Sequence, residues 1–198
     1  MSLALNIVAA SYATWRLHRS GAINWTAFRT LIPASLPAAF AGGAVILPER
    51  LYAVSTAALL LVAALLMVVR GEADHVEDRH VAKIWMALAG LAVGFLSGLT
   101  GIGGGVFLTS LLIALGWLAP RRAAALAAPF ILANSVFGLA GVLYAGQSIP
   151  STFIVYAPAV VIGAIVGTAI GLRWLSQAPT RLILAGILTV ACVRPLAL

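Results

Sequence analysis

One stretch of this chain constrains its fold more than any other, an apolar run from about Ile84 to Leu118 that contains no charged residue. A run of this length is typical of a bilayer, because about 20 apolar residues suffice to cross one. Five of the eight residues from Gly98 to Gly105 are glycine, and each glycine destabilises a helix interior by roughly 1 kcal/mol relative to alanine. The sequence therefore predicts a helix that breaks at membrane depth, where irregular backbone is tolerated only beside protein or a water-filled cavity.

Composition places the whole chain in the membrane class. Of its 198 residues, 63% are hydrophobic and 9% are charged, whereas about a quarter are charged in soluble domains. The net charge of +7 would suggest nucleic acid as the partner of a soluble domain, but basic cytoplasmic loops explain it in a membrane protein. The single cysteine, Cys192, and three histidines without helical ligand spacing to an acid predict no disulfide, no metal site and no cofactor.

Apolar runs predict six full membrane helices in addition to the broken segment. They cover about 1–15, 27–47, 51–69, 123–145, 152–172 and 178–193. Residues 71–83 are polar and hold four of the five acids, and we interpret them as a cytoplasmic linker. This linker would join a partial first repeat, residues 1–70, to a second repeat, residues 84–198.

The positions of the basic residues predict how the broken segment meets the membrane. If residues 84–118 cross once, the 12 arginines and lysines divide about 7 to 5 between the two faces. If the segment enters and leaves on one face as a re-entrant hairpin, only Arg50 and Arg194 lie opposite the rest. Because basic residues concentrate on the cytoplasmic side, the hairpin is favoured. We therefore predict an all-α, multi-pass membrane protein, with the glycines at a turn inside the bilayer.

A weak internal repeat relates the two halves at an offset of about 125 to 131 residues. The matching pairs are Asn6 with Asn134, Pro33 with Pro158, Gly42 with Gly167, and Arg50-Leu51 with Arg181-Leu182. With a hairpin between them, the two sets of helices run in opposite senses. This is the inverted-repeat architecture of many secondary transporters, which bind substrate near the midplane at broken helices.

The residues around the break resemble a known family. Glycines from Gly94 to Gly105 precede an apolar run, a basic loop at Arg121-Arg122, and the element Ala127-Ala128-Pro129-Phe130-Ile131-Leu132-Ala133-Asn134-Ser135. This pattern resembles the TauE/SafE family of sulfite and organosulfonate exporters. The resemblance implies a permease that moves small sulfur-containing anions by alternating access.

Members of that family carry a glycine hairpin in each repeat, and the first half of this chain shows none after Met1. Three explanations stay open: the start is mis-assigned, the chain is a fragment, or another subunit completes the site. A second hypothesis about function follows, in which the chain is a truncated, non-transporting paralogue that acts as an assembly or regulatory membrane subunit.

The break itself supplies the candidate binding groups. A helix N-terminus offers unpaired N–H donors and about half a positive charge, and glycines allow an oxyanion to approach the backbone. We expect Gly101, Gly103, Gly104 and Gly105 to bind the anion, with Thr109, Asn134 and Ser135 as side-chain partners. Close helix packing is the alternative role of the glycines, and a bond to a neighbouring helix is the alternative role of Asn134.

Other readings fit the residues less well. Gly101-Ile102-Gly103-Gly104-Gly105-Val106 lacks the last glycine of a dinucleotide-binding loop, and no lysine follows to form a P-loop. Ser97 sits one position off a Gly-x-Ser-x-Gly elbow, so no hydrolase and no other enzyme is predicted. The expected partners are a small anion and the lipid bilayer, with a homo-oligomer left open. We interpret Arg121 and Arg122 as topological anchors, and the minor alternative is that they concentrate anions at the cytoplasmic mouth.

Overall fold

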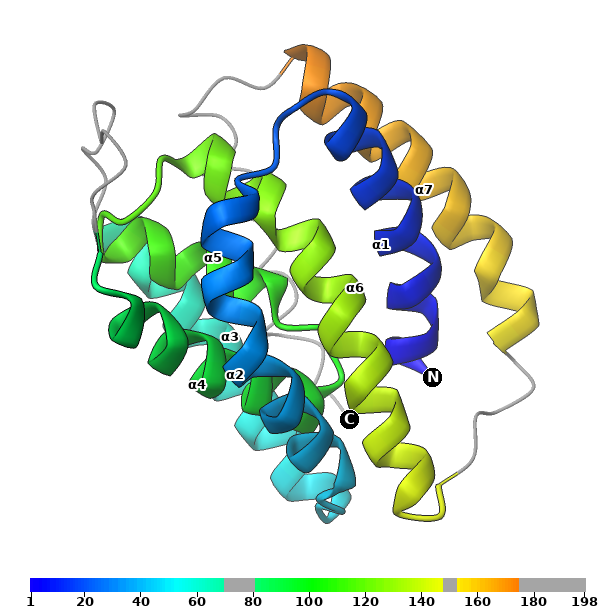
Figure 1. Cartoon of the computed structure of the whole chain (residues 1–198). Coiled ribbons are helices and arrows are strands. Elements are labelled where there is room, and N and C mark those ends of the chain that lie inside the picture. The colour runs from blue at the N-terminus through cyan, green and yellow to red at the C-terminus, as the bar shows by residue number, and fades with distance from the viewer. Residues whose placement is uncertain (70–80, 148–152, 175–198) are drawn as a thin grey trace.

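The apolar runs of the sequence form helices along most of the chain (Figure 1). The computed structural model describes residues 1–69, 81–147 and 153–174, and these ranges contain helices and connecting segments without any strand. The helices are α1 (Ser2–Arg19), α2 (Trp25–Ala44), α3 (Glu49–Val69), α4 (Lys83–Thr100), α5 (Gly105–Ala114), α6 (Pro120–Tyr144) and α7 (Phe153–Trp174). The helix expected at 178–193 and the linker expected over 71–83, as far as residue 80, lie outside the described residues.

The helix boundaries follow the predicted ones closely, with one difference near the start. Helix α1 continues past its expected end at Trp15 to Arg19, because basic side chains in a last turn interact favourably with the helix dipole. The connection between the first two helices, expected over about 16–26, is therefore shorter and spans residues 20–24. Helix α2 then begins at Trp25, where the Asn24 side chain accepts a hydrogen bond of 3.0 Å from the backbone N–H of Ala27.

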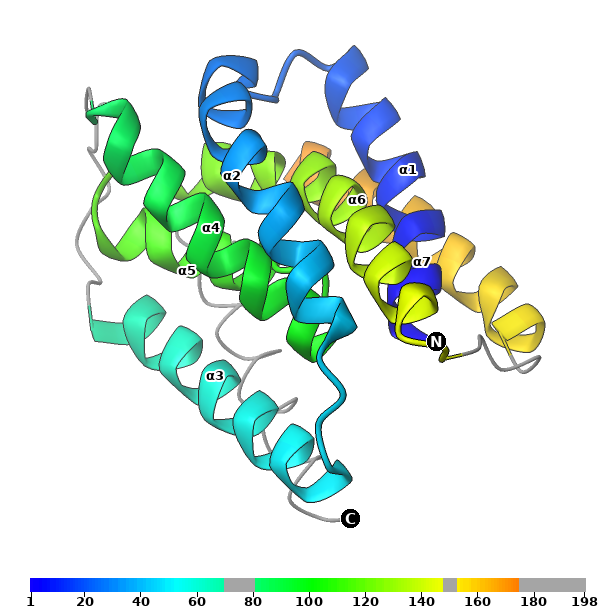
Figure 2. The same ribbon diagram turned by 60° about the horizontal axis from the view of Figure 1, so that its bottom comes forward.

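Glycines let α2 and α4 pack with their backbones in direct contact. A Cβ atom added to any of three α4 glycines would collide with backbone of α2. In order along both helices, the colliding pairs are Gly90 with Leu31, Gly94 with Ser35 and Gly98 with Ala39. Because the residue numbers of both helices increase in the same direction along the contact, α2 and α4 are parallel, as Figure 2 also shows.

Helix α6 joins this pair in the same direction. Its Asn134 meets Ser35 of α2, and one or two turns further on Gly141 meets the backbone of Phe40. A Cβ on Gly138 would lie 3.4 Å from the Cα of Gly98. The helices α2, α4 and α6 therefore form a tight parallel block, with glycines where they cross.

The parallel block determines the path of α5. Since α4 and α6 point the same way and follow one another in the chain, α5 must run back toward the beginning of α4 (Figure 1). The beginnings of α2, α4 and α6 share one end of the bundle with the end of α1. That end carries Arg19, Arg29, Lys83, Arg121 and Arg122, whereas Arg50 begins α3 at the other end. This is the distribution of charge on which the hairpin prediction rests.

Polar side chains are buried and large apolar ones are exposed. Ser35, Ser97 and Ser135 are fully buried, while Trp85 is 60% exposed and Val155 is 74% exposed. Among the described residues, α4 and α6 are long and apolar enough to cross a membrane, and Gly105–Ala114 and Val155–Gly171 are shorter apolar helices. A surface of this kind is suited to lipid, because lipid solvates apolar side chains as well as the protein interior does.

A pair of glycine substitutions tests the backbone contact between α2 and α4. We expect Gly98→Ala to lower the free energy of unfolding by about 2–4 kcal/mol, since the new methyl group would collide with α2. The matched control is Gly163→Ala in α7, where a Cβ meets nothing within 4 Å and helix propensity adds up to about 1 kcal/mol. Thermal unfolding of both variants in detergent measures the difference, and equal stability would contradict the packing described above.

Candidate functional site

The site is organised around the interruption between α4 and α5. Three glycines there have positive φ angles: 66° at Gly101, 86° at Gly103 and 70° at Gly104. An L side chain in this left-handed region costs roughly 1–2 kcal/mol at each position. The N–H of Gly101 donates to the carbonyl of Ser97 (3.0 Å) and closes the last turn of α4. The glycine run predicted a break, and its backbone angles explain why glycine is needed.

The break exposes the start of α5. Helix α5 begins at Gly105, and its N-cap residue is Gly104, which contributes no side-chain hydrogen bond. The N–H groups of its first turn therefore have no partner within the helix, and the helix dipole adds about half a positive charge beside them. Backbone alone makes this position attractive to an anion.

Two buried hydroxyl groups flank the glycines. A Cβ built on Gly104 would lie 3.1 Å from Oγ of Ser97, and one built on Gly103 would lie 3.1 Å from Oγ of Ser135. Ser97 comes from α4 and Ser135 from α6, and both are fully buried. Neither hydroxyl has a hydrogen-bond partner in the described part of the chain. Buried hydroxyls are normally paired, so this arrangement leaves two donors aimed at the break.

Two side chains from the first half of the chain hold the carbonyls at the end of α4. Nδ2 of Asn6 in α1 donates to the carbonyl of Gly101 (3.3 Å), and the Tyr52 hydroxyl in α3 donates to the carbonyl of Thr100. Nδ2 of Asn6 also lies 3.0 Å from the position of a Cβ on Gly103. Asn6 thus closes the site from the side of α1.

Asn134 lies close to the site, with its amide engaged by α2 and by its own helix. Its Oδ1 accepts a hydrogen bond of 2.6 Å from the Ser35 hydroxyl of α2, and its Nδ2 donates to the carbonyl of Phe130 (2.9 Å). Thr109 lies one turn into α5, where its hydroxyl donates to the carbonyl of Gly105 (2.7 Å). Of the side chains predicted from the sequence, only Ser135 therefore has an uncommitted hydroxyl beside the glycines.

Sequence reasoning missed Ser97, Tyr52 and the role of Asn6. A signal existed for Ser97, because it precedes Gly101 by four residues and so lies on the same face of α4 as the start of the break. A signal also existed for Asn6, which aligns with Asn134 in the internal repeat. Tyr52 had none, because only the tertiary packing brings α3 to the end of α4.

Apolar side chains cover the other side of the break. Ile131 of α6 occupies the space that a Cβ on Gly103 or Gly105 would need, and Phe130 lies 3.3 Å from the corresponding position on Gly104. The site is therefore a neutral, largely enclosed niche of backbone N–H and hydroxyl groups. No group of three or more histidine, cysteine, aspartate or glutamate side chains that could hold a metal occurs in the part of the chain that the structure describes.

Buried polar groups inside an apolar exterior, arranged around a broken helix, define a helical membrane protein of the transporter class. Comparison with known proteins agrees. Residues 1–194 match the family described as sulfite exporter TauE/SafE. The chain therefore belongs to the TauE/SafE family, which confirms the resemblance seen in the glycine pattern and makes a membrane transporter, not an enzyme, of this chain.

Two curated relatives carry compatible names. The probable membrane transporter protein y4hK of Sinorhizobium fredii is 32% identical over 194 residues, which cover 96% of this chain and 78% of that protein. A probable membrane transporter protein of Haemophilus influenzae is 30% identical over 117 residues, which cover 58% of this chain and 44% of that protein. No solved structure matches the chain significantly.

The contact between Ser35 and Asn134 generates a stability prediction. Ser35→Ala would leave the buried Oδ1 of Asn134 without its donor, so we expect the free energy of unfolding to fall by about 1–3 kcal/mol. Ser11→Ala is the control, because this exposed hydroxyl bonds only its own helix, to Ile7, and should change stability by less than about 0.5 kcal/mol. Unfolding in detergent measures both. If Ser35→Ala lowers the free energy of unfolding as much in an Asn134→Leu background as in the wild type, the two side chains are not coupled.

Proposed function

We propose that this protein is a permease for small sulfur-containing anions, such as sulfite or organosulfonates, and works by alternating access. The N–H groups at Gly103, Gly104 and Gly105 bind the anion together with the hydroxyls of Ser97 and Ser135. The observation that carries the proposal is the pair of buried, unpartnered hydroxyls beside an uncapped helix start. Gly101 shapes the turn, while Thr109 and Asn134 position α5 and α6 around the bound anion.

A neutral site of this kind can hold an anion inside a membrane. Hydrogen bonds to a charged group contribute about 1.5–3 kcal/mol each, and a helix start supplies several donors that point in one direction. An oxyanion with three oxygens at a sulfur atom can accept from the backbone and from a serine on either side. A fixed arginine or lysine would hold the same anion more tightly, but it would also slow release on the far side.

The substrate class rests on the family. The family is named for sulfite export, and a compact oxyanion suits a niche whose walls are glycine backbone, serine and Ile131. An organosulfonate presents the same sulfur-oxygen group on an organic tail. We therefore propose that the sulfur-oxygen group binds at the break and that the organic tail lies in the transport path beyond it.

The arrangement of helices supports alternating access. Helices α1 and α6 are antiparallel, since Leu3 meets Gly138 while the end of α1 meets the beginning of α6. They are the two members of the predicted repeat that carry Asn6 and Asn134, and inverted repeats require them to run in opposite senses. Both helices contribute side chains at the break. We propose that rocking of the two halves along the contact between α1 and α6 exposes the anion to one face and then to the other.

The same arrangement supports a specific placement in the membrane. With the basic end of the bundle in the cytoplasm, α4 and α5 enter and leave on the cytoplasmic side as a re-entrant hairpin. We propose six full membrane helices around this hairpin, in the bacterial inner membrane. The glycines then lie at the depth where α4, of 18 residues, has risen about 27 Å from its start.

The decisive test is uptake and release of sulfite and of a simple organosulfonate by proteoliposomes that contain the purified chain. We expect saturable flux in the wild type and none with Gly104→Leu, because the new side chain would meet Ser97 and Phe130 at the break. Gly116→Leu is the matched control, since Gly116 also has a positive φ, of 64°, but a Cβ there meets nothing within 4 Å. Absence of flux from well-folded wild-type protein would contradict the transport proposal.

Removing the two hydroxyls separates function from stability. Ser97→Ala and Ser135→Ala delete hydroxyls that have no partner among the described residues, so we expect stability to stay within about 0.5 kcal/mol or to rise slightly. Each change should nevertheless weaken transport about tenfold or more, since a hydrogen bond to an anion is lost. Thermal unfolding and initial flux rates, measured on the same preparations, give both values. Unchanged flux would remove these serines from the site.

A further inference from the structure

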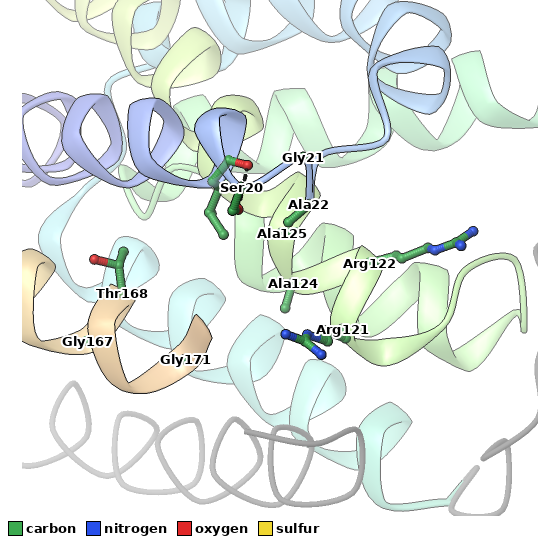
Figure 3. Close-up of a pocket in the computed structure, with 11 residues that line it drawn as sticks. Ser20, Gly21, Ala22, Arg121, Arg122, Ala124, Ala125, Gly167, Thr168 and Gly171 are labelled. Carbon is green, nitrogen blue, oxygen red and sulfur yellow. Dashed lines mark hydrogen bonds between the residues drawn. The ribbon is translucent and has the colours of Figure 1, made fainter. Parts of the chain in front are cut away.

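A cavity of about 590 Å³ lies at the basic end of the bundle, away from the glycine break (Figure 3). It is half open, and it is lined by the end of α1, the beginning of α6 and the second half of α7. The break is more than two helical turns further along both α1 and α6, because Asn6 and Ser135 lie there while Leu17 and Arg121 line the cavity. A volume in this range is typical of small-molecule sites.

The cavity combines an apolar wall with two cations. Leu17, Ala124 and Ala125 supply apolar surface, and Arg121 and Arg122 leave the start of α6 in different directions (Figure 3). None of the described residues that line it is acidic. Each guanidinium carries five N–H donors, so it can contact an anion while it keeps another partner. The cavity is therefore suited to a ligand that is itself amphipathic.

Helix α7 leaves this space open because two of the residues that line it are glycines without a side chain. Gly167 and Gly171 line the cavity, and a Cβ on either would meet no atom of the described residues within 4 Å. Thr168 lies between them and is held by Arg16, whose Nη1 is 3.5 Å from the threonine Oγ1. These two glycines of α7 thus make room for the cavity, and a third arginine adds positive charge beside it.

We propose that this cavity binds the headgroup of an anionic membrane phospholipid. The phosphate would contact Arg121 and Arg122, and the glycerol with the first methylenes of the acyl chains would lie along Leu17 and the glycines of α7. Basic pockets between membrane helices on the cytoplasmic side are suited to such headgroups. The apolar wall favours a lipid over a free anion, because a free anion would gain nothing from Leu17, Ala124 and Ala125.

The test measures binding of phosphatidylglycerol to the purified full chain in a nonionic detergent, by native mass spectrometry and by the shift of Tm. Phosphatidylcholine with the same acyl chains serves as the uncharged comparison, and soluble glycerol phosphate as the headgroup without a tail. We expect saturable binding of phosphatidylglycerol alone. The variant Arg121→Gln/Arg122→Gln should bind it about thirtyfold more weakly, since each cation near the membrane surface contributes about 1 kcal/mol.

Matched controls separate the cavity from general charge and from folding. Arg29→Gln removes an exposed cation at the same end without touching the cavity, and should bind as the wild type does. Gly167→Leu fills the cavity while every charge is kept, and should weaken binding about tenfold. Gly163→Leu, one turn earlier in α7 and also in open space, should not. Equal binding of both lipids, no effect of Gly167→Leu, or equal competition by glycerol phosphate would each overturn the lipid assignment.

Discussion

The whole structure depends on one constraint, that backbone polar groups exposed in an apolar interior must find partners. A helix that stops at Thr100 leaves carbonyls at its end and N–H groups at the start of the next helix. The carbonyls are satisfied by Asn6 and Tyr52, which come from helices far away in the sequence. The N–H groups at the start of α5 are those that we propose bind the anion. The end of α4 is thus held by the protein itself, whereas the start of α5 is the proposed binding site.

Close packing of the parallel block makes this division stable. Backbone contacts at Gly90, Gly94 and Gly98 bring α2 against α4 without intervening side chains, so dispersion contacts replace the hydrophobic driving force that lipid does not supply. The Ser35 hydroxyl then reaches Asn134 and ties α6 into the block. The break is therefore attached to a rigid scaffold on one side. On the other side it meets α1 through the hydrogen bond from Asn6 to Gly101, a contact that could break and re-form under the proposed alternating access.

Charge is separated from the proposed site along the bundle. The break has only neutral donors, while basic residues gather at the end where α2, α4 and α6 begin. The basic residues would attract an anion toward their end of the bundle. The break would hold the anion only reversibly, because the glycines offer dipoles and no fixed charge. The same basic end offers the cavity between α1, α6 and α7, where apolar wall and arginines occur together. One distribution of arginine thus orients the protein in the membrane and provides a place for an anionic lipid.

The sequence by itself determined the membrane class, nearly all described helix boundaries, the break and the family, because each depends on local composition or spacing. A run of apolar residues forms a helix in lipid wherever it packs, and glycines at Gly101, Gly103 and Gly104 interrupt it through their own backbone angles. Only the tertiary structure decided which side chains meet at the break. Asn134 was predicted beside the substrate but has its amide bound to Ser35 and Phe130, while the hydroxyls of Ser97 and Ser135 at the break have no partner among the described residues. Which hydrogen-bond partner a side chain finds depends on which helices face each other. That is decided by packing between helices far apart in the sequence, which no local sequence pattern shows.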